Sequence, residues 1–201
     1  MSDFSALGRF KPANATNVAK STEAAPKAFR WTGSGKIVAF DQSLANTGYI
    51  VAEVAQKRIS VIASGTIHTV NSGGRKSWTD TLYRARELIE PIREVVAEHD
   101  PVLILHEMPP IGNSRSMHRP DSSILSALAI WVAVDPLPIR MVDARTVKRH
   151  LTGKAGATKK EVRTALESRL GGVLDDKHLR KNEHTFDALG ILVCYITKEH
   201  K

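Results

Sequence analysis

The sequence of 201 residues has a single cysteine, Cys194, and no long hydrophobic run. One cysteine excludes an internal disulfide and a cysteine-rich zinc site, and it fits a reducing cytoplasm. No run approaches the roughly 20 apolar residues of a membrane-spanning helix. The N-terminal segment also lacks the apolar core of a secretory signal. We therefore expect a soluble cytoplasmic protein with no membrane partner.

Acidic residues are fewer than basic ones. The chain has 21 Asp and Glu against 29 Lys and Arg, a formal net charge of +8. Such an excess favours a polyanionic partner, with nucleic acid first and an acidic membrane surface second. The charge informs about partners and solubility and does not indicate a fold.

The N-terminal residues 1–35 lack a clear apolar period and are rich in Ala, Ser, Thr, Asn and Pro. We interpret them as a disordered basic arm, which either drapes on DNA or is an inert tail. Residues 36–201 form the predicted folded domain. The basic residues of the arm are Arg9, Lys11, Lys20, Lys27 and Arg30.

The folded part alternates short apolar runs with amphipathic segments. Wholly apolar runs at 37–40 and 102–105 are typical of parallel strands buried on both faces. The pattern predicts an α/β fold whose mixed five-stranded sheet has three antiparallel and two parallel strands, with helices on both faces. The other expected strands are 48–54, 59–70 and 138–142. The segment 77–99 is expected to be helical, with a kink at Pro91 or as two helices in sequence. The other expected helices are 123–134, 144–151, 159–170 and 183–198.

Two expected parallel strands end in a carboxylate, Asp41 and Glu107. If the strands are neighbours, their backbones lie about 4.8 Å apart and both acids project at one edge of the sheet. Like charges this close repel unless a cation joins them. Oxygen ligands suit magnesium or manganese. The alternative for Asp41 is a turn residue that caps its own backbone.

The last expected helix carries His184 and Asp187, which share a face because they are three residues apart. Ile191 and Cys194 continue that face with apolar character, so it points toward the core. A histidine and an aspartate at the start of such a stripe are candidates for metal or catalytic chemistry. The alternative is a capping histidine and an aspartate paired with an arginine.

In their order along the chain, these motifs resemble the active site of the RuvC-type Holliday-junction resolvases, in the RNase H-like nuclease superfamily. Residues 41–48 resemble its first-strand Asp followed by Thr-Gly, residues 103–107 its fourth-strand glutamate, and residues 184–189 its C-terminal motif. The resemblance covers the chain from about residue 36 onward. Gln42-Ser43 stands where bacterial members often have Pro-Gly, which favours a bacteriophage-like member.

The resemblance implies an RNase H-like fold and a homodimer that cuts four-way DNA junctions by paired symmetric nicks, leaving 5′-phosphates. It also implies two divalent ions per active site, Mg²⁺ with Mn²⁺ possible, in a bacterial or bacteriophage-infected cell. Asp41, Glu107, His184 and Asp187 would be catalytic and metal-binding, and His184 would be either a ligand or a base. The helix at 123–134, with Leu125, Leu128 and Trp131, is the candidate dimer face, although core packing explains these residues equally well.

A basic segment from 145 to 163 carries the positions that resemble the family's junction contacts, and the loop after Glu107 adds two arginines. Such side chains position DNA through phosphates without reading bases. A solvated basic helix is the alternative. The expected DNA-binding residues are Arg115, Arg119, Arg145, Lys148, Arg149, Lys154, Lys159, Lys160 and Arg163.

Three other functions are compatible with parts of the pattern. A related RNase H-like nuclease would use the same four residues on forks, flaps or RNA. A catalytically inactive module would bind junctions only, although the presence of all four candidate ligands argues against it. An ATP-binding protein of the actin and sugar-kinase type also opens with a strand, an acid and a Gly/Ser/Thr turn, but this chain is too short for its two halves.

Overall fold

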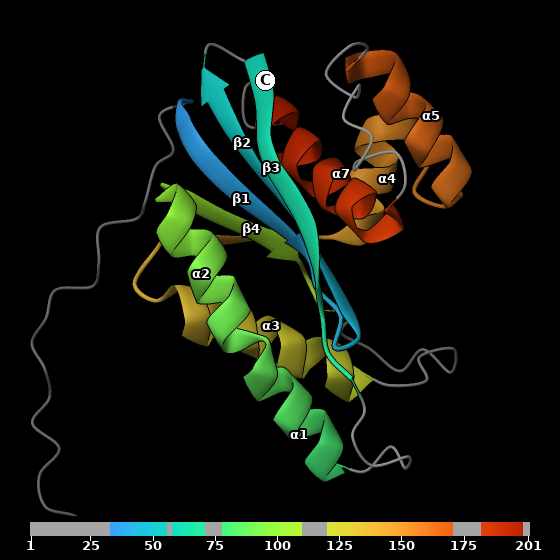
Figure 1. The fold of residues 1–201 in the computed structure, drawn as a ribbon. Coiled ribbons are helices and arrows are strands. Elements are labelled where there is room, and N and C mark those ends of the chain that lie inside the picture. The colour runs from blue at the N-terminus through green and yellow to red at the C-terminus, as the bar shows by residue number, and fades with distance from the viewer. Residues whose placement is uncertain (1–32, 56–57, 71–77, 110–119, 171–181, 199–201) are drawn as a thin grey trace, which may run out of the picture. The chain divides into compact units, whose positions relative to one another are not determined.

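Five strands form one mixed sheet in the computed structural model (Figure 1). The strand order is β3-β2-β1-β4-β5, with β2 antiparallel to β1 and β3, and β4 parallel to β1 and β5. This confirms the predicted sheet. The strands are β1 (Gly35–Asp41), β2 (Asn46–Ala55), β3 (Arg58–His68), β4 (Leu103–Glu107) and β5 (Ile139–Val142).

The structure describes residues 33–55, 58–70, 78–109, 120–170 and 182–198. Every described residue belongs to the compact unit 31–201. The predicted disordered arm therefore falls almost wholly outside the described residues and stays a prediction. Within the described ranges, no helix is long and apolar enough to cross a membrane.

Helices cover both faces of the sheet, as predicted (Figure 1). One face packs against α1 (Trp78–Glu87), α2 (Ile89–His99) and α3 (Pro120–Val134). The other carries α4 (Ala144–Thr152), α5 (Lys159–Leu170) and α7 (Glu183–Lys198).

The helical segment predicted at 77–99 is two helices that join at Leu88. The break does not fall at Pro91, which occupies the first turn of α2. Backbone N–H groups in a first turn have no partner within the helix, so a proline there removes no hydrogen bond.

The strand β1 is the centre of the core. Ile37 to Phe40 are fully buried, and so are Leu103 to Leu105 of the neighbouring β4. Val38, Phe40 and Ile104 pack into the cluster formed with α1, α2 and α3. Alternation along the strand turns Ile37 and Ala39 to the opposite face, against α7. Burial on both faces explains why these strands are wholly apolar.

Candidate active site

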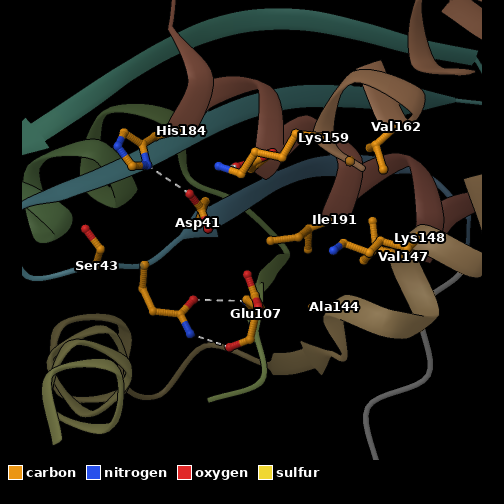
Figure 2. Close-up of a pocket in the computed structure, with 13 residues that line it drawn as sticks. Asp41, Ser43, Glu107, Ala144, Val147, Lys148, Lys159, Val162, His184 and Ile191 are labelled. Atoms are coloured by element: carbon orange, nitrogen blue, oxygen red, sulfur yellow. Dashed lines mark hydrogen bonds and ion pairs between the residues drawn. The ribbon is translucent and has the colours of Figure 1, made fainter. Parts of the chain in front are cut away.

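A pocket of about 310 Å³ lies where β1 and β4 end and α4, α5 and α7 begin (Figure 2). Its lining includes all four predicted site residues: Asp41, Glu107, His184 and Asp187. The structure therefore brings together side chains that are up to 146 positions apart in the sequence, from Asp41 to Asp187. Lys148 and Lys159 also line this pocket.

Strand pairing places Asp41 beside Glu107. The parallel pairing of β1 with β4 runs from Ile37↔Leu103 to Phe40↔His106, so the next residue on each strand is one of the two acids. Burial, followed by the charge of Asp187, raises the pKa of Asp41. Burial, followed by the charges of Asp41 and Asp187, raises the pKa of Glu107 to about 7. The fully ionised pocket is therefore unfavourable without a cation.

The first turn of α7 brings His184 to Asp41. The side chain of Asn182 caps this helix, because its Oδ1 accepts the backbone N–H of His184 at 3.1 Å and that of Thr185 at 3.4 Å. His184 Nδ1 then lies 3.2 Å from Asp41 Oδ2, the dashed line between these residues in Figure 2.

A glycine on β2 permits this close approach of α7. A Cβ added at Gly48 would lie 2.3 Å from the carbonyl carbon of His184. Gly48 is also the β2 partner of Asp41. The preceding Thr47 closes the turn after β1, since its hydroxyl donates to the carbonyl oxygen of Ser43 at 2.7 Å. The Thr-Gly pair thus has a physical role in assembling the site.

The first turn of α5 brings a cation to the site. The hydroxyl of Thr158 and the carboxylate of Glu161 form a capping box that fixes the start of this helix. Lys159 Nζ lies 3.2 Å from Asp187 Oδ2 and also contacts Glu183. Burial alone would lower the pKa of Lys159, but the hydrogen bonds to Glu183 and Asp187 and the charges of both raise it.

The donors of the pocket fit hard divalent cations. Asp41, Glu107 and Asp187 supply carboxylate oxygens, which Mg²⁺ and Mn²⁺ prefer. Repulsion among these acids, and the ammonium of Lys159 on one of them, show that the pocket attracts positive charge. No three His, Cys, Asp or Glu side chains within the described ranges form a ready-made cage.

The predicted DNA-binding residues divide into four groups. Lys148 and Lys159 line the pocket, whereas Arg115 and Arg119 lie outside the described residues. Arg149 lines a separate hollow with Arg169 and Lys198. The remaining four lie on α4 and α5 and in the loop between them: Arg145 and Lys160 are exposed, Lys154 pairs with Glu161, and Arg163 pairs with Glu167 and lies over the ring of Phe186 on α7.

Sequence reasoning did not single out three polar residues that support the site. Gln42 hydrogen-bonds the backbone of Glu107, Asn182 caps α7, and Asp143 caps α4 while its charge adds to the raised pKa of Glu107. One sequence signal was available, because Asp143 directly follows β5 just as Asp41 ends β1. Asn182 offered a second signal, because an asparagine directly before an expected helix is a favoured N-cap residue. The role of Gln42 depends on a contact between distant segments.

Comparisons with known proteins agree with this geometry. The model of the family described as crossover junction endodeoxyribonuclease RuvC matches residues 37–195. The protein of that name from Chlorobaculum parvum is 28% identical over 163 residues, 81% of each chain. Its counterpart from Salinibacter ruber is 25% identical over 160 residues, 79% of this chain and 83% of the relative.

Solved structures of Thermus thermophilus RuvC share the fold. The structure of that protein superposes with a TM-score of 0.64 at 19% identity, covering 82% of this chain and 96% of the other. Its complex with Holliday junction substrate gives a TM-score of 0.64 at 18% identity, with 82% and 94% coverage. The predicted likeness to bacteriophage members stays a prediction.

Proposed function

Since this chain belongs to the RuvC family of crossover junction endodeoxyribonucleases, we propose that it cleaves four-way DNA junctions by metal-dependent hydrolysis of phosphodiester bonds. The observation that carries the proposal is the meeting of Asp41, Glu107, His184 and Asp187 in one pocket. Two relatives that bear the name of this activity, and the junction complex of Thermus thermophilus RuvC, support the choice of substrate.

Each side chain of the pocket has a role in the proposed reaction. Asp41, at the centre, would hold both of two Mg²⁺ or Mn²⁺ ions, while Glu107 would hold one and Asp187 the other. When bound, such ions would supply positive charge to the attacking and the leaving oxygen of the phosphodiester. The products are a 5′-phosphate and a 3′-hydroxyl.

His184 has one ring nitrogen toward Asp41 and the other available for chemistry. With Nδ1 donating its proton to Asp41 Oδ2, the neutral ring keeps a lone pair on Nε2. That lone pair can take the proton of the attacking water or bind an ion. The contact with Asp41 holds the ring in place for either role.

Two lysines of the pocket would receive the DNA backbone. Lys148 and Lys159 line the pocket together with the acids, so a phosphate group that enters it would contact both ammonium groups. The other predicted basic residues would hold the junction arms through phosphates. Binding of this kind depends on branch shape and weakens steeply with added salt.

A homodimer would deliver the paired cuts, because two symmetric nicks require two active sites related by a two-fold axis. The exposed apolar residues of α3 make it the candidate interface: Ile124, Leu128, Trp131 and Val132. Leu125 of the predicted face instead packs against the core. We place the protein in the cytoplasm of a bacterial cell, as its curated relatives are bacterial.

The decisive experiment compares wild type and Asp41→Asn on four-way junction, fork, flap, RNA and linear duplex with Mg²⁺. We expect symmetric nicks in the junction alone. The substitution should reduce cleavage more than about 1,000-fold, since losing even one transition-state hydrogen-bond donor costs about 100–1,000-fold, while junction binding survives. Preferential cutting of forks, flaps or RNA would assign the related nuclease activity. Binding without cutting by wild type would assign an inactive module.

A further inference from the structure

Glu107 is the last residue of β4 and lies one residue beyond the last backbone pair between β4 and β1. The backbone pairing of β4 with β1 ends at Phe40↔His106. On the other side, β4 is still paired at Glu107↔Val142, and Met108 N donates to Val142 O at 2.9 Å. In a parallel ladder successive residues bond to alternate sides, so the N–H and C=O of Glu107 point toward the place where β1 has ended.

The side chain of Gln42 fills that place. Its Oε1 accepts the backbone N–H of Glu107 at 3.0 Å, and its Nε2 donates to the carbonyl oxygen of the same residue (the two dashed lines at Glu107 in Figure 2). A primary amide carries one acceptor and two donors in a plane, so it can replace the two peptide groups that a longer β1 would offer. Gln42 is only 9% exposed, which shields these bonds from water.

A second contact holds the same carbonyl oxygen. The indole N–H of Trp131 lies 2.9 Å from His106 Nε2, and an indole can only donate. The proton of the neutral His106 ring is therefore on Nδ1, which lies 2.8 Å from the carbonyl oxygen of Glu107. Both lone pairs of that oxygen are then satisfied, and Gln42 supplies the bond on the side of Asp41.

We propose that Gln42 is a positioning residue, whose side-chain amide extends the β1–β4 pairing by one residue and fixes the Glu107 carboxylate relative to Asp41. This role rests on the proposed metal-dependent function. It acts on the ligand and not on the ion, because both polar atoms of the Gln42 amide are engaged by the Glu107 backbone. Loss of such a supporting contact typically weakens metal binding by about 10–100-fold.

The test measures Mn²⁺ affinity directly, from the electron paramagnetic resonance signal of free Mn²⁺ titrated with the full chain. Gln42→Leu keeps similar bulk without hydrogen bonds, and Gln42→Asn keeps the amide on a side chain one methylene shorter. Ser126→Ala is the matched control, because Ser126 is fully buried in α3 and, among the described residues, its hydroxyl bonds two backbone carbonyls of that helix. Junction binding in EDTA is measured for every variant.

We expect both Gln42 variants to bind Mn²⁺ about tenfold more weakly, with unchanged junction binding in EDTA and an unchanged Mn²⁺ affinity in Ser126→Ala. If Gln42→Leu does not fold, Gln42→Asn alone decides. Wild-type affinity in a folded Gln42 variant, or an equal loss in Ser126→Ala, overturns the role of Gln42 while leaving the nuclease intact. Wild-type protein that neither binds Mn²⁺ nor cuts junctions overturns both proposals.

Discussion

The two halves of the site are built in opposite ways. Asp41 and Glu107 stand on adjacent strands whose backbones are fixed by the sheet ladder, and burial raises the pKa of both. His184 and Asp187 stand on the first turns of a helix, where their side chains are 34% and 30% exposed against 14% for Asp41. Asp41 and Glu107, which we call the strand half, lie on a rigid backbone and are short of positive charge. His184 and Asp187, the helix half, are more exposed, and the ammonium of Lys159 already pairs with Asp187.

Because one half is held by strands and the other by a docked helix, the two halves depend on different contacts. The pairing of β1 with β4 reaches Phe40 and His106, and the Gln42 amide extends it to Glu107, so the spacing of Asp41 and Glu107 is held by backbone and amide contacts. The helix half depends on the docking of α7 against β2 and on side chains from α5. Substitutions at the contacts that dock α7 should therefore disturb catalysis more than stability.

Gly48→Ala tests the docking of the helix half and should have the largest effect among substitutions that leave the four site residues unchanged. The new methyl group would lie 2.3 Å from the carbonyl carbon of His184 and 2.4 Å from its oxygen, so α7 must move. We expect junction cleavage to fall at least about 100-fold, since a misplacement of 1 Å can cost that much. Single-turnover cleavage with Mg²⁺ measures it.

Gly190→Ala is the control on α7 itself, where it adds the same methyl group at a position that also lines the pocket. Its added Cβ would meet only side chains, the nearest at 3.5 Å, which is ordinary contact. Removing a glycine from a helix interior should raise the free energy of unfolding by about 0.5–1 kcal/mol, with cleavage retained. Equal losses of activity in the two variants would contradict the close approach at Gly48 as the cause.

The stability of the metal-free protein should depend on pH through the carboxyl group of Glu107 in the strand half. In the metal-free protein, burial and the neighbouring carboxylates raise the pKa of Glu107 from 4.5 to about 7. The native state thus holds a proton that the unfolded chain has lost between these values, so this group's contribution to stability falls as pH rises from 4.5 to 7. The decrease is up to about 3 kcal/mol at 1.36 kcal/mol per pKa unit.

Urea unfolding in EDTA at pH 5 and pH 7.5 checks this expectation, with Glu107→Gln as the control that lacks the titrating group. Raising the pH from 5 to 7.5 should lower the unfolding free energy of wild type relative to that of Glu107→Gln. Metal binding has the opposite sign, because an ion requires the ionised carboxylate, so Mn²⁺ affinity should rise with pH up to about 7. A pH-independent difference between the two proteins would contradict the raised pKa.

The strand half was largely predictable from the sequence. The runs at 37–40 and 102–105 are wholly apolar because both faces are covered, and that pattern identified the two strands and the acids at their ends. His184 and Asp187 were predictable from helical spacing. These signals are local, and each needs only a few neighbouring residues.

Contacts between distant segments were not predictable. Gln42 lies 65 positions from the backbone that it bonds, and Lys159 lies 28 positions from Asp187. The sequence also could not tell which basic residues of α4 face the pocket. Successive helical residues point about 100° apart, so Lys148 lines the pocket while Arg149 lines another hollow.

Lys159→Met removes the ammonium group that pairs with Asp187 and should have the smallest effect. The affinities for Mn²⁺ and for the junction should change in opposite directions. The Lys159 ammonium lies on Asp187 in the metal-free pocket, so it opposes an incoming ion both by charge and by occupying a ligand oxygen. Mn²⁺ affinity should therefore rise several-fold, while junction binding in EDTA weakens and its salt slope falls by about one. Lys160→Met removes the same charge one residue along the helix, at an exposed position that does not line the pocket. An equal gain in Mn²⁺ affinity there would show that net charge, and not the contact with Asp187, is what the metal competes against.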